Sequence, residues 1–153
     1  MEEYPYFPIF INLSEKKVVV IGAGNIAKRR IQVLSEFTRH LTVVAPVVHP
    51  DVEGLAKSGA IQLLRKKYEA EDIYGAALVL AATNDRKVNH EIYEICKKQG
   101  IPVNVCDDRE KCDFYFPGIV RKDEVVVGVT ASGKDHGRAR RVTEVVRAAL
   151  ETL

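Results

Sequence analysis

The sequence has little of three features that would place it in a special class of protein: cysteine, excess charge and long apolar runs. Three cysteines in 153 residues are too few, and odd in number, for a disulfide framework. The 23 Lys and Arg residues nearly balance 21 Asp and Glu residues, giving a formal net charge of +2, whereas nucleic-acid binders usually carry a strong basic excess. No apolar run approaches the roughly 20 residues that span a bilayer, and the acidic start has no signal-peptide pattern. We therefore expect a cytoplasmic protein of one globular domain with an appendage, and neither nucleic acid nor a membrane as partner.

Common catalytic and metal-binding patterns are also missing from the sequence. The four histidines are scattered, and no two have the spacing of a helical metal site. Cys106 and Cys112 lack the second pair or the nearby histidine of a zinc site. There is no serine nucleophile elbow and no Walker loop. We therefore predict no metal centre.

Short apolar runs and amphipathic segments alternate through the first two thirds of the chain. The runs typical of buried strands are 16–21, 41–45, 61–64, 76–82 and 101–106, and the segments typical of helices are 26–34, 50–58 and 86–99. Strands and helices that alternate with short links form right-handed βαβ units. Residues 1–113 therefore predict a Rossmann-type α/β domain, with a mainly parallel sheet and helices on both faces.

The pattern changes after Asp108. Residues 114–120 and 124–130 predict two strands joined by a polar turn, and such closely linked strands pair antiparallel. A final helix is expected from about Asp135 to the end. We thus expect 114–153 to form a segment distinct in topology, with a short strand pair and a C-terminal helix.

The segment Gly22-Ala23-Gly24-Asn25-Ile26-Ala27 matches the dinucleotide-binding pattern GxGxxA. The first glycine permits a tight turn, the second lets the backbone approach a pyrophosphate, and the small third residue lets the helix pack closely on the strand. The helix N-terminus then holds the phosphates through free N–H groups. Because this loop follows an expected strand and opens an expected helix, it predicts dinucleotide binding.

One element of the dinucleotide pattern is missing. An Asp or Glu usually follows the second strand and binds the adenosine ribose, but Ala45-Pro46-Val47 stands there instead. Ribose recognition is therefore expected from backbone groups of Pro46 and Val47 or from another residue. Spacing alone leaves NAD and NADP open, because Arg29 or Arg30 could reach a 2′-phosphate, although both are also typical of a solvated helix face.

Candidate chemistry follows the fourth and fifth strands, since ligands of open α/β sheets bind outside the carboxyl ends of the strands. Small residues and Thr83-Asn84 follow the fourth strand and could border a nicotinamide ring. Asp107 and Asp108 follow the fifth, and a carboxylate there could act as a general base. The alternative is that Asp108 caps the next turn and Asp107 is a surface charge.

A basic cluster opens the last helix and interrupts the even charge distribution. Residues 134–141 read KDHGRARR, and such a cluster suits a small polyanion or is an ordinary basic helix face. Its candidate ligand-binding residues are Lys134, Arg138 and Arg141.

Taken together, these segments resemble the precorrin-2 dehydrogenase family, the amino-terminal module of siroheme synthases. GAGNIAKRR at 22–30 resembles the family loop GGGxVAxRK, and AATNDRKVN at 81–89 resembles AATDDxxVN. The most specific block is 103–117, VNVCDDREKCDFYFP, which is similar to NVVDDPxxCDFxxP. The resemblance covers almost the whole chain.

The resemblance implies NAD-dependent oxidation of precorrin-2, an acidic tetrapyrrole, to sirohydrochlorin in siroheme biosynthesis. It implies that Asp107 is the critical carboxylate and that the chain forms a homodimer through the segment after the fifth strand. It also favours NAD, since the missing ribose acid is then a family trait. The cofactor contacts that the resemblance implies are Gly22, Gly24, Asn25, Ile26, Pro46 and Val47. Thr83 and Asn84 are added to them because they follow the fourth strand, where the nicotinamide is expected.

Two alternatives stay open. The first adds ferrochelatase activity at the same site; we expect it less because the chain stops at Leu153, where many relatives continue with a helical part. The second is a non-catalytic NAD(H)-sensing module, which leaves the 103–117 block unexplained. The replacement of the family's Ser-Pro pair by Asp135-His136 also leaves the start of the last helix open.

Overall fold

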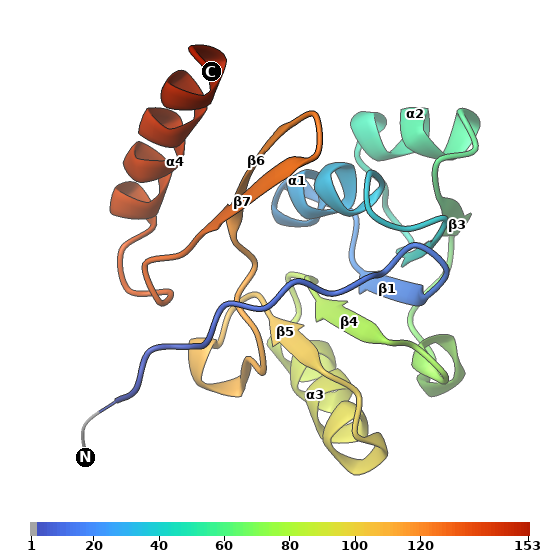
Figure 1. The fold of residues 1–153 in the computed structure, drawn as a ribbon. Coiled ribbons are helices and arrows are strands. Elements are labelled where there is room, and N and C mark those ends of the chain that lie inside the picture. The colour runs from blue at the N-terminus through green and yellow to red at the C-terminus, as the bar shows by residue number, and fades with distance from the viewer. Residues whose placement is uncertain (1–2) are drawn as a thin grey trace. The chain divides into compact units, whose positions relative to one another are not determined.

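The β-branched runs form a five-stranded parallel sheet (Figure 1). The computed structural model describes residues 3–153. Its strands, in the spatial order β3-β2-β1-β4-β5, are β1 (Lys17–Ile21), β2 (His40–Val44), β3 (Gln62–Leu64), β4 (Leu78–Ala81) and β5 (Val103–Val105). The order reverses between β1 and β4, and open α/β sheets bind their ligands at such a switch point.

Three helices connect these strands. They are α1 (Asn25–Leu34), α2 (Pro50–Lys57) and α3 (Arg86–Gln99). Because parallel crossovers are right-handed, α1 and α2 cover one face of the sheet and α3 covers the other (Figure 1). Asp85 caps α3 by accepting from the N–H of Lys87 at 2.9 Å, and Gly100 ends it in the left-handed conformation (φ 68°). The expected α/β fold class is confirmed.

The core lies between the sheet and its helices. Val18, Val19 and Val20 of β1 are fully buried, because the central strand is covered on both faces. Ala27 and Ile31 of α1 are equally buried. This buried central strand fixes the position of the loop that leaves its carboxyl end.

The antiparallel pair consists of β6 (Gly118–Lys122) and β7 (Val125–Val129), and α4 (His136–Glu151) follows it. A side chain at Gly118 would lie 2.4 Å from the Thr143 hydroxyl, so this glycine permits the close approach of α4 to β6. Thr143 is buried and its hydroxyl donates to the Ala139 carbonyl at 2.7 Å.

The first strand of this pair begins later than its apolar pattern predicts, at Gly118 instead of Phe114. Pro117 has no N–H to donate to a ladder, and the preceding segment is bound elsewhere: the Asp113 N–H donates to the Val103 carbonyl at 2.9 Å. The turn contains Asp123 with φ 51°, which suits a two-residue hairpin. Two short 3₁₀ helices, η1 (Ala70–Ile73) and η2 (Arg109–Lys111), were not expected.

The chain divides into two units, one of residues 11–114 and one of residues 1–10 together with 115–153. In the second unit the ring of Tyr6 stacks on that of Tyr115, with centroids 4.0 Å apart. Within residues 3–153, no helix combines the length and the apolar character needed to cross a bilayer. The same residues contain no group of three His, Cys, Asp or Glu side chains arranged to hold a metal ion.

Candidate functional site

Gly22 makes the tight turn that leaves β1. Its φ is +115°, and a Cβ there would lie 2.2 Å from the carbonyl oxygen of Ala82. Its N–H donates to the Val44 carbonyl at 2.9 Å. Because β4 passes so close and β2 holds the other side, only glycine fits at the switch point of the sheet.

Gly24 is the N-cap of α1, and its surroundings suit a bound anion. No side chain caps this helix and its first turn contains no acidic residue. A Cβ at Gly24 would find no atom within 4 Å, so the approach to the backbone is open. The first N–H groups of a helix have no partner within the helix, and here they are free to bind a pyrophosphate with the help of the helix dipole. The residues present therefore fit a dinucleotide.

Exposed apolar side chains lie beside this candidate pyrophosphate site. Ile26 in the first turn of α1 is 61% exposed, and Val47, in the loop after β2, is 82% exposed. Pro46 is also exposed. Since β1 and β2 are neighbours in the sheet, these residues border one edge of the glycine loop. Apolar side chains there can pack against the adenine ring of a dinucleotide.

The loop after β4 is held by Asn89, which lies on α3 and is fully buried. The Asn89 Oδ1 atom accepts from the Thr83 N–H at 3.2 Å and from the Thr83 hydroxyl at 2.7 Å. The Asn89 Nδ2 atom donates to the Thr83 carbonyl at 3.1 Å. Thr83 therefore uses its polar groups to fix the loop, while Asn84 next to it is exposed.

Sequence reasoning did not give Asn89 a role. Its signal is an amide on the helix face that also carries the buried Ile92 and Cys96. A buried amide needs partners for its donors and acceptors, and the N–H, hydroxyl and carbonyl of Thr83 supply them.

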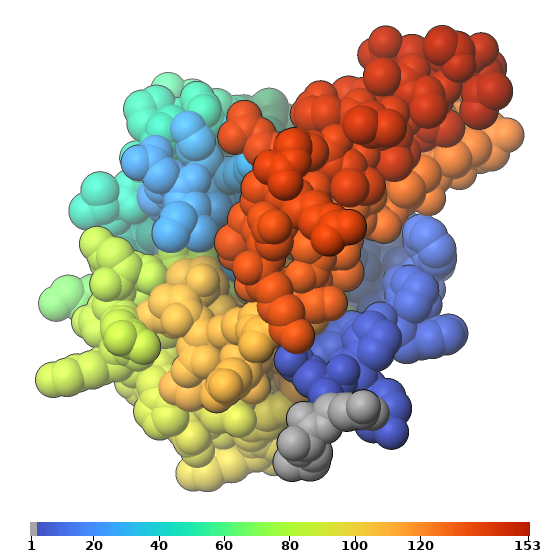
Figure 2. Space-filling view, turned by 90° about the vertical axis from the view of Figure 1, so that its left-hand side faces the viewer, coloured from blue at the N-terminus to red at the C-terminus, as the bar shows by residue number. Residues whose placement is uncertain are grey.

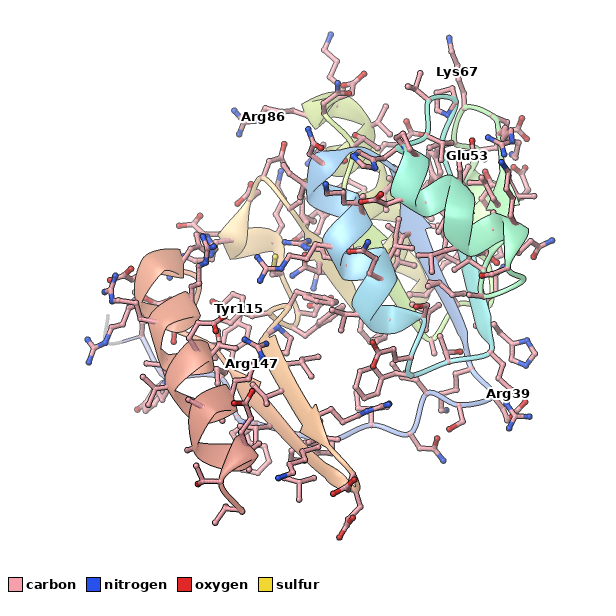
Figure 3. All side chains as sticks on the ribbon, turned by 90° about the horizontal axis from the view of Figure 1, so that it is seen from above. Arg39, Glu53, Lys67, Arg86, Tyr115 and Arg147 are labelled. Carbon is pink, nitrogen blue, oxygen red and sulfur yellow. The ribbon has the colours of Figure 1, made fainter. Side chains whose placement is uncertain are left out.

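Asp107 lies in the turn after β5, with its side chain 30% exposed. Its carboxylate is 3.6 Å from Nε of Arg86, the first residue of α3. Arg86 projects outward and is 82% exposed (Figure 3), so this ion pair is weak. Figure 2 shows the segment after β5, in gold, beside the start of α3, in yellow-green. The carboxylate is thus accessible at the same edge of the sheet as Gly22 and Thr83.

Asp108 has a different environment from Asp107. Its side chain accepts from the Glu110 N–H at 3.2 Å as the N-cap of η2, and it lies 3.3 Å from the Lys111 ammonium. This is the capping role that the sequence offered as the alternative to catalysis.

Two thiols flank these acids. Burial raises the pKa of Cys106, whose Sγ lies 3.7 Å from the Thr83 carbonyl. Burial also raises the pKa of Cys112, whose Sγ donates to the Val105 carbonyl at 3.3 Å. Both are neutral thiols at physiological pH, as the packing role of free cysteine predicts.

Arg30 joins α1 to β5. Its Nη1 atom donates to Asn104 Oδ1 at 2.6 Å, and Asn104 Nδ2 donates to the Phe114 carbonyl at 2.9 Å. Burial lowers the pKa of Arg30, yet a guanidinium stays charged in proteins. Since Arg30 is held at β5, it is not directed to the end of β2, where an adenosine 2′-phosphate would lie.

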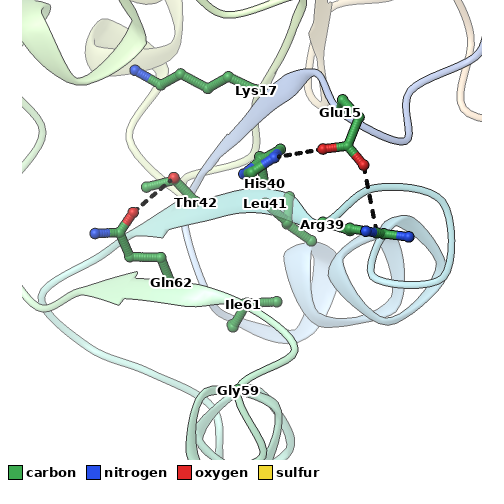
Figure 4. A pocket seen from close by; sticks show the side chains of 9 residues that line it. All are labelled: Glu15, Lys17, Arg39, His40, Leu41, Thr42, Gly59, Ile61 and Gln62. Atoms are coloured by element: carbon green, nitrogen blue, oxygen red, sulfur yellow. Dashed lines mark hydrogen bonds and ion pairs between the residues drawn. The ribbon is translucent and has the colours of Figure 1, made fainter.

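A separate hollow of about 550 Å³ lies at the amino ends of β1, β2 and β3 (Figure 4). Arg39 and His40 pair there with Glu15, at 3.5 and 3.2 Å. Gly22 and Gly24 follow the carboxyl end of β1, so this hollow lies at the opposite edge of the sheet and does not belong to the candidate site.

The candidate basic residues belong to the other unit, at the start of α4. Lys134 lies 2.8 Å from the Glu3 carboxylate. The Arg138 N–H donates to Asp135, which caps the helix, at 2.8 Å. Arg138 and Arg141 are exposed and three residues apart, hence on one face of the helix. Asp135 thus starts α4 where the family pattern has a serine.

The comparisons with known proteins agree with this arrangement. Residues 9–118 match the model of the NAD(P)-binding family NAD_binding_7. The "Probable multifunctional siroheme biosynthesis protein HemA" of Ruminiclostridium josui is 41% identical over 145 residues, which are 94% of this chain and 28% of that protein. A siroheme synthase of Psychrobacter arcticus is 35% identical over 147 residues, covering 96% of this chain and 26% of that protein.

A solved structure, "SirC, precorrin-2 dehydrogenase", superposes with a TM-score of 0.80 at 24% identity, covering 94% of this chain and 70% of that chain. This likeness shows the same fold. The chain spans about a quarter of the length of the two curated relatives described above.

Proposed function

Because the chain belongs to the NAD(P)-binding family NAD_binding_7, we propose that it catalyses the NAD-dependent dehydrogenation of precorrin-2 to sirohydrochlorin in siroheme biosynthesis. The observation that carries the proposal is the coincidence of two findings. The glycine loop stands at the switch point of the sheet, and proteins named for siroheme synthesis match 94–96% of the chain.

The proposal assigns the dinucleotide to the first unit. The pyrophosphate lies against Gly22, Gly24 and the free N–H groups of Asn25 and Ile26. Pro46 and Val47 border the adenosine end, and Thr83 and Asn84 border the nicotinamide end. When bound, NAD supplies the group that accepts a hydride.

Removal of two hydrogens from the macrocycle releases a hydride and a proton. Asp107 is proposed to accept that proton, since its carboxylate is accessible and its only described ion pair, with Arg86, is exposed. Orientation of the macrocycle by the same carboxylate is the second role that this position supports. An Asp107→Asn variant, which lacks the negative charge, tests which role applies. Full activity in this variant would exclude Asp107 as the proton acceptor.

The carboxylates of precorrin-2 are assigned to Lys134, Arg138 and Arg141. Arg138 and Arg141 share a helix face, and guanidinium groups bind carboxylates in bidentate fashion.

The proposal includes the homodimer and assigns residues 1–113 to cofactor binding and 114–153 to dimerisation and substrate. Exposed Val142 and Val145 on α4, at 42% and 69%, support a partner for this segment. We also propose that the protein is cytoplasmic.

The test is an assay of the purified chain with NAD⁺ and precorrin-2, followed at 340 nm for NADH. Formation of NADH with sirohydrochlorin supports the dehydrogenase. Binding of NAD without turnover supports a sensing module instead. Incubation of sirohydrochlorin with Fe²⁺ or Co²⁺, followed by its absorption spectrum, tests the added chelatase activity.

A further inference from the structure

Three charged or polar side chains gather beside the end of β2, where the usual ribose-binding acid is missing. They are Lys28 on the second turn of α1, and His49 and Asp51 at the start of α2. The His49 N–H donates to the carbonyl of Ala23 at 2.8 Å, which fastens this group directly to the glycine loop. The side chains of Lys28, His49 and Asp51 are 32%, 25% and 50% exposed, so a ligand can reach them.

The imidazole of His49 makes two contacts that one tautomer cannot satisfy together. Its Nδ1 accepts from the Asp51 N–H at 3.0 Å, as the N-cap of α2. Its Nε2 lies 3.4 Å from the Lys28 ammonium. A neutral imidazole has one N–H, and an ammonium group only donates. Since the shorter backbone contact requires a bare Nδ1, the proton is on Nε2, and two donors face each other there.

The two facing donors, on Lys28 and His49, can both be satisfied by one acceptor placed between them. The carboxylate of Asp51 lies 3.8 Å from Lys28 Nζ and 3.8 Å from His49 Nδ1, which is beyond a hydrogen bond to either. The three side chains therefore present two donors and one acceptor at the same place. A hydroxyl group, which both accepts and donates, satisfies such a set.

We propose that Lys28, His49 and Asp51 form the subsite for the adenosine ribose hydroxyls and that Asp51 sets a preference for NAD over NADP. This inference rests on the proposed dinucleotide binding. The ribose oxygen accepts from Lys28 and His49, and the ribose hydroxyl donates to Asp51. The 2′-phosphate of NADP only accepts hydrogen bonds and is negatively charged, so the Asp51 carboxylate repels it.

The two arginines that follow Lys28 are less suited than Lys28 to bind the ribose. Arg30 donates to Asn104 at the opposite side of α1. Arg29 is exposed and supplies the same charge as Lys28 one residue further along the helix. It is therefore the matched control.

The experiment measures the dissociation constants of NAD⁺ and NADP⁺ by isothermal titration calorimetry at pH 8, with no tetrapyrrole present. The variants are Asp51→Asn, Lys28→Met, His49→Asn and Arg29→Met. Asn at position 49 retains a cap for α2 but is too short to replace Nε2. Thermal unfolding of each variant checks that it is folded.

Asp51→Asn is expected to strengthen NADP⁺ binding about tenfold and to change NAD⁺ binding less. Lys28→Met and His49→Asn are expected to weaken NAD⁺ binding about fivefold, as the loss of one hydrogen bond predicts, while Arg29→Met leaves it unchanged. An unchanged NADP⁺/NAD⁺ ratio in folded Asp51→Asn overturns the inference. Failure of the unaltered protein to bind either dinucleotide overturns the proposed function instead.

Discussion

The two glycines of the loop separate folding from cofactor binding, and a pair of alanine substitutions tests this. At Gly22 a Cβ would lie 2.2 Å from the Ala82 carbonyl oxygen and 2.6 Å from its carbon, in a backbone with φ +115°. At Gly24 the Cβ would meet nothing within 4 Å, and φ is −90°. The same added methyl group is therefore forbidden by the fold at one position and tolerated at the other.

The cost of Gly22→Ala has two parts. An alanine at positive φ costs about 1–2 kcal/mol, and displacing β4 to relieve the overlap costs about 1–3 kcal/mol. The sum, about 3 kcal/mol, lowers the melting temperature of a chain of this size by roughly 10 °C. Gly24→Ala is expected to lower the melting temperature by no more than about 3 °C, since the substitution stands at the N-cap, where alanine costs about 1 kcal/mol or less relative to glycine.

The assay combines thermal unfolding followed by circular dichroism with NAD⁺ titration. Gly24→Ala is expected to bind NAD⁺ at least tenfold more weakly, because its methyl group occupies the open approach to the backbone, while it stays folded. If Gly24→Ala binds NAD⁺ normally, the pyrophosphate does not lie against this backbone. If Gly22→Ala melts with the unaltered protein, the close passage of β4 is wrong.

Three further predictions concern the other strand ends and the core. Asp107→Asn is expected to lower kcat at least a hundredfold with an unchanged NAD⁺ dissociation constant, whereas Asp108→Asn changes mainly stability; equal kcat losses in a steady-state assay would contradict the assignment. Asn89→Ala is expected to cost about 2–3 kcal/mol in urea unfolding, because it leaves the Thr83 backbone unpaired, and a loss below 0.5 kcal/mol would refute its positioning role. Burial raises the pKa of Cys96 from 9.0 to about 12, so its contribution to stability is complete below pH 9 and is lost as the pH rises toward 12. Between pH 7 and 10.5 the unaltered protein should therefore lose about 2 kcal/mol more than Cys96→Ala, and an equal loss in both would show that this thiol does not ionise on unfolding.

The sheet and its helices could be predicted from the sequence because each has a strong local signal. The β-branched run at 17–21 and the N-cap Asp85 act within a few residues, and Gly100 ends its helix by its own backbone freedom. β6 begins later than its apolar pattern predicts because the Asp113 N–H donates to the Val103 carbonyl. Periodicity does not reveal such a contact between residues ten positions apart.

The site was only partly readable for the same reason. GxGxxA is a contiguous pattern with a direct physical meaning, and it predicts its own environment. Asn89 and the pair of Lys28 with His49 acquire their roles from partners on other elements. His49 in particular is a loop histidine in the sequence and becomes informative only through the tautomer that the Asp51 N–H imposes.

The most direct test of the central proposal is the anaerobic reaction of the purified chain with precorrin-2 and NAD⁺. We predict NADH at 340 nm in a one-to-one ratio with sirohydrochlorin, formed at least a hundredfold more slowly by Asp107→Asn. Tight binding of NAD⁺ with no NADH from precorrin-2 would contradict it.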